Sequence, residues 1–444
     1  MPDYSDLDPS LLKASISYGD RLKESITTEL YTTGTPTAAN QIQRSIMYED
    51  GTLKESIATA TGLKASWLLS GAAPVASTDF ITEWSIVDNG TAAQRTITVP
   101  TTGTGYSYDI DWGDGTVETS QTTANPSHEY AAGTGTTTPT VKISGTFPRI
   151  YFNNGGDKTK ITAVTNWGSV GTTSAARAFY GCSNLTTAPN GAWDVSDWGY
   201  GFHTCSSLTL PTALFQGNTS IANLDRCFMS STFTELPALT FSGCTGVTNY
   251  QYLCYENTSL TTIYANQFSD SASATVFQYI YHGCDSLATV PSGHFSGTAG
   301  ANFTYAFAYM ASLSSLPQYL FPNTATAFNR TFVNCSNLVT LPSNLFGTAS
   351  VTDYQYCFYN SGITTIPDAG NWDISAVTTM SNMFFGCTIN TTDYNAMLVG
   401  WEAQTEPTGI TFHGGSSKHS GAGTTARGVL TGTSTWVITD GGAV

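Results

Sequence analysis

A short phrase of sequence returns throughout the middle of this chain. Residues 179–189 read FYGCSNLTTAP, and residues 332–342 read FVNCSNLVTLP. When the apolar residue at the position of Leu185 is taken as the anchor of each copy, successive anchors lie 23 to 27 residues apart. The anchors are Ile161, Leu185, Leu208, Phe233, Leu260, Leu287, Leu313, Leu338 and Ile363. A period in the twenties is typical of solenoids, in which each repeat forms one coil.

Three further columns recur at nearly fixed distances from the anchors. A proline follows most anchors: Pro189, Pro211, Pro237, Pro291, Pro317, Pro342 and Pro367. An aromatic follows the proline position: Trp193, Phe215, Phe241, Phe268, Phe295, Phe321, Phe346 and Trp372. Six residues before the anchors stand Phe179, Phe202, Cys227, Cys254, Tyr281, Phe307, Phe332 and Cys357. One coil cannot bury its own apolar side, so neighbouring coils must stack, each buried leucine or aromatic contributing about 1.5–3 kcal/mol.

Each coil also carries local signals. The phrase Leu-x-x-Leu/Ile-Pro predicts a short strand that the proline ends. Segments such as Phe303–Phe307 and Phe328–Phe332 predict a helical or 3₁₀ turn on the opposite side. The nine cysteines fall mostly on repeat columns. Because free cysteine is among the most buried residue types, we expect reduced cysteines that act as small core hydrophobes.

One stretch resembles a known family. Residues 371–387 read NWDISAVTTMSNMFFGC, which is similar to the repeat unit of the BspA-like leucine-rich repeats of bacterial and phage surface proteins. The resemblance covers about half the chain, and it is looser in the middle coils. It implies a right-handed solenoid used in adhesion, and it implies no catalytic residue.

A different pattern precedes the repeats. Residues 96–100, 106–112 and 140–144 alternate apolar and polar residues as strands do, which predicts a β-sandwich. Residues 112–116 read WGDGT and are followed by His128-Glu-Tyr130. This combination resembles the PKD domain family, and it implies an Ig-like sandwich over residues 79–150. Residues 147–152 lead into the first coil without a long linker, so sandwich and solenoid are expected to meet rigidly.

The end of the chain departs from the repeat. Residues 393–401 have helical apolar spacing, and residues 409–415 and 435–442 resemble strands. Because a solenoid end exposes an open core, an atypical last unit is needed as a cap. The predicted fold class is therefore mainly β: an Ig-like, PKD-type β-sandwich, a leucine-rich-repeat-like solenoid over residues 155–390 and a C-terminal cap over residues 391–444.

The first 75 residues contain their own small repeat. The segment Ser15–Ile26 returns at Ser45–Ile57 with one inserted residue, and the second copy carries Glu49-Asp50-Gly51, a tight-turn signal that predicts a hairpin. Helix is the alternative, since Leu, Lys, Glu and Ala favour helices. Few large apolar side chains are available for a core, so we expect an attachment segment that orders on a scaffold or on its own copies. The alternatives are an ordinary small domain or a flexible leader. Residues 71–77 are predicted as a linker.

Charge and hydropathy exclude several classes of partner. The net charge is −16, with 16 Lys and Arg, which argues against nucleic acid and anionic membranes. No run of 18 apolar residues occurs, so we expect no membrane insertion. The acidic N-terminus carries no apolar export signal. A surface-type protein without an export signal could leave the cell by assembling into a phage particle that is released when the cell lyses, and this is the simplest explanation.

No catalytic constellation is evident. The chain has no GxSxG, HExxH or phosphate-binding GxxxxGK[ST] motif. Asp109, Asp111 and Asp114 suggest calcium, but the first two share one strand face and the third is a turn former. For His128 we expect a structural role. We therefore expect no enzyme, no cofactor and no metal.

The candidate binding residues are exposed hydroxyls. Between the two apolar positions of each predicted strand stand small polar residues that stacking would align into columns: Thr186, Thr187, Thr234, Thr261, Thr262, Thr289, Ser314, Ser315, Thr340, Thr364 and Thr365. Such a ladder suits a glycan, although Glu235 interrupts it. Tyrosines could also stack on sugar faces if exposed, with core packing as the alternative: Tyr250, Tyr252, Tyr279, Tyr305, Tyr354 and Tyr356.

These features predict a non-enzymatic, elongated binding protein. We expect a phage fibre or decoration protein on the virion surface, attached through residues 1–75 to capsid or tail proteins, with homo-oligomers possible. Its solenoid would meet a host-surface glycan or protein. The alternatives are a bacterial cell-surface adhesin exported without a standard signal and a carbohydrate-active enzyme.

Overall fold

The computed structural model describes residues 22–26, 44–48, 53–56, 77–133, 135–300, 302–346 and 351–444. The chain divides into two compact units, Met1–Ser77 and Thr78–Val444. In the described residues strands outnumber helices, and no sheet closes into a barrel. The prediction of a mainly β protein is confirmed.

The first unit contains one antiparallel sheet. Its strands are β1 (Leu22–Ile26), β2 (Arg44–Tyr48) and β3 (Leu53–Ser56), in the order β1-β2-β3. Strands β2 and β3 form the predicted hairpin, with Met47 opposite Leu53. These three segments are strands and not the alternative helices. The turn at residues 49–52, the segment 15–21 and the linker predicted at residues 71–76 lie outside the described residues.

The second unit begins with a five-stranded antiparallel sheet of order β12-β4-β11-β7-β8. The strands are β4 (Phe80–Trp84), β7 (Ser107–Asp111), β8 (Val117–Gln121), β11 (Thr140–Thr146) and β12 (Ile161–Asn166). Two small sheets accompany it, β5 (Ile86–Val87) with β10 (Thr136–Thr137) and β6 (Thr96–Thr98) with β9 (Ser127–Glu129); a short helix, α2 (Ala92–Arg95), precedes β6. Alternate residues such as Tyr108 and Ile110 are buried, as period-two patterning requires.

A compact set of contacts fixes the WGDGT turn after β7. Tyr130 donates a hydrogen bond from its hydroxyl to the Trp112 carbonyl (2.7 Å). The His128 ring stacks on Trp112 with centroids 5.2 Å apart, and its Nε2 lies 2.7 Å from Asp114 Oδ2. Gly113 has φ +81°, and a Cβ there would meet the Thr140 carbonyl at 2.5 Å. His128 is therefore packed and hydrogen-bonded, as expected.

Strand β12 joins this sheet to the repeats. It pairs with β4 on one side, and Ala163 forms a parallel bridge with Thr187 of the next coil on the other. Ile161, the first anchor, lies in this strand. The sheet and the first coil therefore share a strand and have no linker between them.

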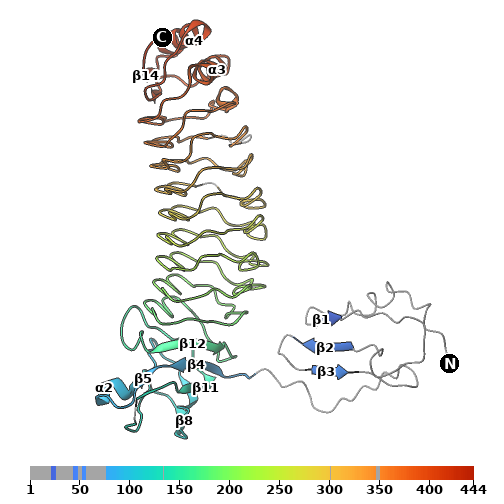
Figure 1. Ribbon diagram of the computed structural model, residues 1–444, viewed down its shortest axis with the longest axis vertical. Helices are drawn as coiled ribbons and strands as arrows, with labels where there is room; N and C mark the ends of the chain where they lie inside the picture. The colour runs from blue at the N-terminus through green and yellow to red at the C-terminus, as the bar shows by residue number, and fades with distance from the viewer. Residues whose placement is uncertain are drawn as a thin grey trace, which may run out of the picture. The chain divides into compact units, whose positions relative to one another are not determined.

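The repeats form coils stacked one on another between the sheet and helices α3 and α4, as Figure 1 shows. One ladder of parallel bridges follows the predicted strands, through pairs such as Glu235 with Thr262 and Thr340 with Thr365. A second ladder, which we did not predict, runs through Asp197, Asn223, Asn249, Val276, Asn302, Ala327, Asp353 and Thr379. Each coil donates backbone N–H groups to the next coil, for example from Phe332 to the Cys357 carbonyl (2.8 Å).

The predicted helical or 3₁₀ turns are wrong in detail. Residues 303–307 and 328–332 form hydrogen-bonded turns, with Ala306 N–H donating to the Phe303 carbonyl (2.9 Å). Tyr305 and Arg330 have φ values of +56° and +55°. A residue in the left-handed region interrupts any helical path, so each coil turns sharply at these points.

The anchors fill one continuous core. All nine anchors are at most 5% exposed and belong to a single cluster of buried residues. Aromatic rings stack face to face from coil to coil, as in Phe307–Phe332 (5.5 Å, 8°) and Phe332–Phe358 (5.4 Å, 3°). In two coils the ring of this column is one residue later than we predicted, at Phe228 and Phe358 instead of Cys227 and Cys357.

All nine cysteines are buried and free. Several hold a polar contact that we did not predict: the Cys335 thiol donates to the Phe307 carbonyl of the preceding coil (3.0 Å). At the equivalent position of other coils, Ser231 and Ser361 donate from their hydroxyls to Phe202 and Phe332 (3.1 and 2.6 Å). Cysteine in this column is therefore a small hydrogen-bond donor as well as an apolar filler.

The last coil is followed by two helices and two short strands. A 3₁₀ turn, η1 (Ala369–Asn371), leads to α3 (Thr391–Glu402), β13 (Thr411–His413), α4 (Gly421–Gly432) and β14 (Val437–Thr439). The predicted helix is present as α3, while α4, which is rich in Gly and Thr, was not predicted. Strand β13 continues the coil ladder through a parallel bridge between Met380 and Phe412, so this segment covers the end of the stack.

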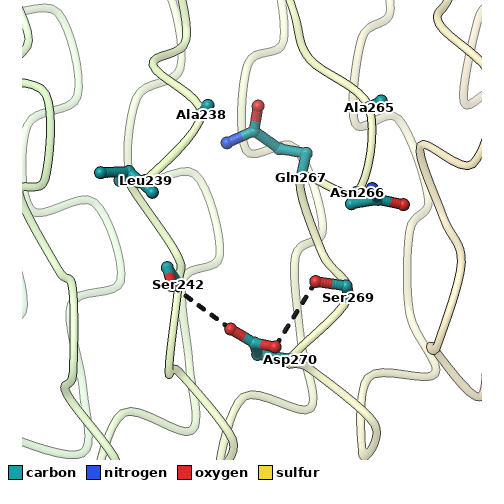
Figure 2. Close-up of a pocket in the computed structure, with 8 residues that line it drawn as sticks. All are labelled: Ala238, Leu239, Ser242, Ala265, Asn266, Gln267, Ser269 and Asp270. Carbon is teal, nitrogen blue, oxygen red and sulfur yellow. Dashed lines mark hydrogen bonds between the residues drawn. The ribbon is translucent and has the colours of Figure 1, made fainter. Parts of the chain in front are cut away.

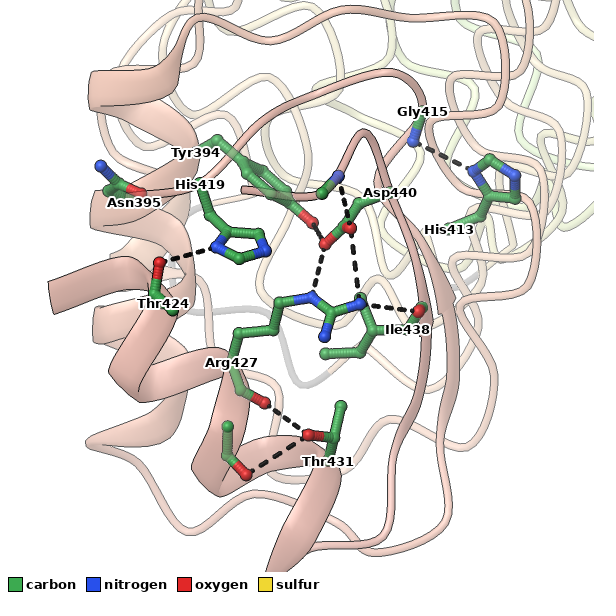
Figure 3. A network of polar contacts seen from close by, with 12 residues as sticks. Tyr394, Asn395, His413, Gly415, His419, Thr424, Arg427, Thr431, Ile438 and Asp440 are labelled. Atoms are coloured by element: carbon green, nitrogen blue, oxygen red, sulfur yellow. Dashed lines mark hydrogen bonds and ion pairs between the residues drawn. The ribbon is translucent and has the colours of Figure 1, made fainter. Parts of the chain in front are cut away.

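A buried carboxylate ties the end segment together (Figure 3). The Asp440 side chain is 2% exposed and accepts hydrogen bonds from Arg427 Nε (2.8 Å), the Tyr394 hydroxyl (2.9 Å) and the Gly442 N–H (3.1 Å). Burial alone would raise the pKa of Asp440, but these hydrogen bonds outweigh it and lower that pKa. Asp440 therefore links α3, α4 and β14.

The thiol contact predicts an order among substitutions of Cys335. Cys335→Ser keeps a donor for the Phe307 carbonyl, whereas Cys335→Val removes it, so we expect the valine variant to be about 1–2 kcal/mol less stable than the serine variant. Urea unfolding of the full chain measures the difference. A valine variant as stable as the serine variant would show that the thiol acts only as an apolar filler.

The carboxylate network predicts a pH-dependent loss. Asp440→Asn leaves Arg427 without its charged partner and is expected to cost about 2–3 kcal/mol. Because the folded pKa of Asp440 is lowered, its contribution is complete above the unfolded value of about 3.9 and is lost as the pH falls through the folded value. The stability difference between the native chain and Asp440→Asn, measured by urea unfolding, should shrink below about pH 4. A constant difference from pH 7 to pH 2 would contradict this assignment.

Candidate binding surfaces of the coils

The predicted hydroxyl residues lie along the first bridge ladder. Nine are exposed: Thr186, Thr187, Thr234, Thr261, Thr289, Ser314, Ser315, Thr340 and Thr364. Thr262 and Thr365 are partly exposed. The parallel bridges Thr289–Ser315 and Thr340–Thr365 align them from coil to coil. We call these eleven residues the hydroxyl ladder.

Several of these hydroxyls are held in one orientation. Thr186 donates to the Thr162 carbonyl (3.0 Å), Thr261 to the Thr234 carbonyl (3.0 Å) and Ser314 to the Ala288 carbonyl (3.3 Å). Each donor proton is thereby used within the coils. The lone pairs of each oxygen remain available as acceptors for a ligand hydroxyl or amide.

Two shallow depressions lie between neighbouring coils. One, which adjoins the hydroxyl ladder, is lined by residues 206–210 and 232–235, among others, and includes Glu235. Figure 2 shows the other, where Asp270 accepts hydrogen bonds from Ser242 and Ser269 (both 3.4 Å). The Tyr264 hydroxyl donates to Glu235 (2.7 Å). Each depression holds one carboxylate, already engaged by neighbouring side chains.

A second column of side chains, which we did not predict as a unit, lies on the turns of the coils. Its members are Arg177, Tyr200, Arg226, Tyr252, Tyr279, Tyr305, Arg330 and Tyr356, all with φ between +53° and +58°. We call it the Arg–Tyr column. Each member donates its backbone N–H to the next coil, for example Tyr252 to the Gln278 carbonyl (2.9 Å). The backbone therefore fixes the spacing of the column.

Side chains of the second bridge ladder shape these turns. Asp197, Asn223 and Asn249 each accept a hydrogen bond from the N–H two residues later, at 2.9, 3.1 and 2.9 Å. Asn and Asp commonly stabilise turns in this way. The residue that comes directly after each N–H donor is the left-handed member of the Arg–Tyr column. The second bridge ladder therefore positions that column.

The column is continuously stacked. The Tyr279 ring lies 4.4 Å from Tyr252 and 4.6 Å from Tyr305, with interplanar angles of 10° and 11°. The Arg226 guanidinium lies 4.1 Å from the Tyr252 ring centroid, and the Arg330 guanidinium lies 4.3 Å from that of Tyr356. These contacts link cation–π pairs with aromatic stacks along one line.

The tyrosines predicted for sugar stacking divide into two groups. Tyr250 and Tyr354 are fully buried, so for these two the alternative of core packing is correct. Tyr252, Tyr279, Tyr305 and Tyr356 are partly exposed and belong to the Arg–Tyr column.

Tyr252, Tyr279 and Tyr305 each have a column neighbour on both sides, so their ring faces are not free for a sugar, whereas Tyr356 has one column neighbour, Arg330. Burial raises the pKa of Tyr279 to about 12, so its hydroxyl stays protonated at neutral pH. The column had a sequence signal: in eight successive coils an Arg or Tyr stands two residues before the stacked core position, which holds an aromatic ring in seven coils and Cys254 in the other.

The aspartates considered for calcium are engaged in the sheet and its turns. Asp109 and Asp111 lie in β7, where they accept hydrogen bonds from the N–H groups of Ser120 (2.7 Å) and Gly113 (2.9 Å). Asp114 accepts from the Thr116 N–H (2.9 Å) as well as contacting His128. Over the described ranges, no three His, Cys, Asp or Glu side chains gather as metal ligands would. Within the same ranges no helix has the length and apolar character needed to cross a membrane.

Comparison with known proteins gives one partial match. Residues 326–408 match the family DUF285, described as a Mycoplasma protein of unknown function. This stretch contains residues 371–387, the segment that resembles the BspA-like repeats, and extends from the last coils through α3. No curated protein matches the chain.

The stacking geometry predicts that Tyr279 stabilises the coils. Tyr279→Ala removes the stacked contacts with Tyr252 and Tyr305 and two looser ring contacts, with Tyr255 and His282, and should cost about 1–3 kcal/mol beyond the loss of buried area. Tyr319→Ala is the matched control, because Tyr319 has φ +51° but is 60% exposed and makes no ring contact with the described residues. Urea unfolding compares the two variants, and equal losses would show that the stack adds no stability.

Proposed function

We propose that this chain is a non-enzymatic binding protein built from a PKD-type, Ig-like β-sandwich, a leucine-rich-repeat-like solenoid and a C-terminal cap. The five-stranded antiparallel sheet and its alternate burial support the sandwich. The repeat of about 25 residues, with parallel bridges between coils, supports the solenoid. Its match to DUF285 supports a relationship of residues 326–408 to BspA-like repeats.

The observation that carries the binding role is the hydroxyl ladder. Exposed Thr and Ser side chains are repeated at the spacing of the coils and fixed by hydrogen bonds to the backbone. A rigid row of acceptors needs little ordering when a ligand binds, and small ordering costs favour affinity. We assign a host-surface glycan or protein as its ligand.

The acidic side chains of the depressions favour binding over hydrolysis. Glycoside hydrolysis commonly uses two carboxylates that flank the bond to be cleaved. Glu235 and Asp270 stand in separate depressions; Glu235 accepts a hydrogen bond from the Tyr264 hydroxyl, and Asp270 accepts from the Ser242 and Ser269 hydroxyls.

The proposed setting is the surface of a phage particle, with residues 1–75 attached to capsid or tail proteins. The small sheet β1-β2-β3 supports an attachment role, because strands with few large apolar residues gain stability from a partner. The second candidate is a bacterial cell-surface adhesin, which the match to a Mycoplasma family favours. Mass spectrometry of purified particles and of cell envelopes separates the two. Presence in particles supports the first, whereas presence only in envelopes supports the second.

The hydroxyl ladder predicts an attachment defect without unfolding. Replacing Thr261 and Thr262 by Val and Ser314 and Ser315 by Ala should weaken attachment of the purified protein to host cells by about tenfold or more, equivalent to about 1.4 kcal/mol. Thr248→Val with Thr378→Val is the control, because both hydroxyls are exposed and donate to the preceding coil in the same way, but each lies one residue before the second ladder. Flow cytometry with labelled protein measures attachment, and unchanged attachment of the first variant would contradict this surface.

A further inference from the structure

We propose that the Arg–Tyr column binds a linear, sparsely charged acidic polysaccharide. This inference rests on the proposed role as a surface-binding protein and assigns a ligand class to the Arg–Tyr column. Its grounds are the position of the basic residues, the backbone conformation of the column and the groups that surround it.

The basic residues of the coils are confined to this column. Between residues 161 and 417 the sequence contains Arg177, Arg226 and Arg330 and no other Lys or Arg. All three stand at the same position of their coils, although a coil offers about 25 positions. In a chain with a net charge of −16, the coils thus concentrate their positive charge on a single line.

The backbone alone does not require these residues. Each member of the column has a left-handed conformation, which costs a residue other than glycine roughly 1–2 kcal/mol. A second left-handed position, two residues before the aromatic that follows the proline, uses mostly residues that tolerate this conformation: Gly191, Asn266, Gly293, Tyr319 and Asn344. The Arg–Tyr column contains neither Gly nor Asn in eight successive coils, and the next coil places Asn382 at the same position with φ +55°. Its large side chains are therefore kept for their own contacts.

The guanidinium groups retain N–H donors for a ligand. Arg226 donates from Nη1 to Asp225 (2.6 Å), Arg330 from Nη1 to the Asn329 side chain (2.8 Å) and Arg177 from Nη1 to the Tyr151 hydroxyl (3.4 Å). Their other N–H groups make no hydrogen bond within the described residues. Arg177 and Arg330 therefore have an uncharged partner that leaves their positive charge unpaired, whereas Arg226 forms an ion pair with Asp225 and contributes its remaining N–H donors.

The charge spacing suits a sparsely charged polymer. Coils follow one another at about 4.8 Å, the spacing of hydrogen-bonded strands, so two coils separate Arg177 from Arg226 by about 10 Å and four separate Arg226 from Arg330 by about 19 Å. A DNA duplex carries one charge per about 1.7 Å of its axis, which is far denser than this column. An acidic polysaccharide with uncharged hydroxyl-rich stretches matches the alternation better.

Neutral polar groups fill the intervals between the charges. Tyr252, Tyr279 and Tyr305 lie between Arg226 and Arg330, and the position before each of these three tyrosines carries Gln251, Gln278 and Thr304, all partly exposed. Amide and hydroxyl groups both donate and accept hydrogen bonds, as sugar hydroxyls do. The column therefore offers charged donors for carboxylates and neutral partners for the sugars between them.

The test uses full-length protein and polygalacturonate, a linear uronic-acid polymer, with its methyl-esterified form as the uncharged counterpart. Isothermal titration calorimetry should show binding to polygalacturonate that is at least about tenfold tighter than binding to the methyl ester. A single-stranded oligodeoxynucleotide is the third probe. Equal binding of both polysaccharides, no binding of either, or tighter binding of the oligonucleotide would overturn the proposal.

Charge-matched variants locate the site. Arg177→Gln, Arg226→Gln and Arg330→Gln together should weaken polygalacturonate binding by about tenfold or more. The control, Lys142→Gln with Lys158→Gln and Lys418→Gln, removes the same charge outside the column and should leave binding within about twofold. Equal losses in both variants would refute a site on this column. If the triple arginine variant fails to fold, Arg226→Gln and Arg330→Gln are measured singly, and each should still weaken binding more than Lys418→Gln.

Attachment to host cells separates the two proposals. If polygalacturonate does not bind while cell attachment persists and depends on Thr261 and Thr262, the acidic ligand is wrong and the proposed function stands. If neither polygalacturonate nor host cells bind, both fail.

Discussion

The hydrogen bonds that join one coil to the next hold this structure together. Backbone donors such as those of Arg177, Tyr252 and Phe332 point along the stack to the following coil, so most coils depend on two neighbours. The two ends of the stack are covered in different ways. Strand β12 belongs both to the first coil and to the five-stranded sheet, and at the far end Phe384 N–H donates to the His413 carbonyl of β13. Strand β12 extends the first bridge ladder, through Ala163 and Thr187, and strand β13 extends the second, through Met380 and Phe412.

Because the coils stack in register, a local feature of one coil is repeated along the surface of the whole stack. An Asn or Asp that accepts a hydrogen bond from the N–H two residues later sets a turn, and the turn places the next residue in the left-handed region. Repetition in register then aligns those residues at the spacing of the coils. The Arg–Tyr column is produced in this way, whereas the hydroxyl ladder is aligned by the parallel bridges of the first ladder.

The sequence was most informative where burial repeats. The anchors from Ile161 to Ile363 were placed correctly in one core, because apolar residues that recur at a constant period need a shared interior to leave water. The register was wrong at Cys227 and Cys357, since the number of residues between the ring and the anchor varies from coil to coil. The turns were wrong because nothing in local propensity marks Tyr305 or Arg330 as left-handed.

The two candidate surfaces differ in how far the sequence predicts them. The exposed hydroxyls were predicted because they stand between the two apolar positions of the strand phrase. The Arg–Tyr column was missed as a unit because tyrosine and arginine have no common side-chain chemistry in sequence, and only the geometry shows that they stack on one another. Helix α4 was missed because its Gly and Thr residues favour other conformations, and contacts with α3 and the Arg427–Asp440 pair compensate.

The equivalence of the coils has a consequence for how such a chain changes during evolution. Every contact within the stack joins a coil to its immediate neighbours, so duplication or deletion of one whole repeat leaves the remaining interfaces complete. Such an event between Arg226 and Arg330 would alter the distance between these two guanidinium groups in a step of about 4.8 Å. Recombination within the repeats could thus tune both the reach of the protein and the charge period it presents, without any new fold.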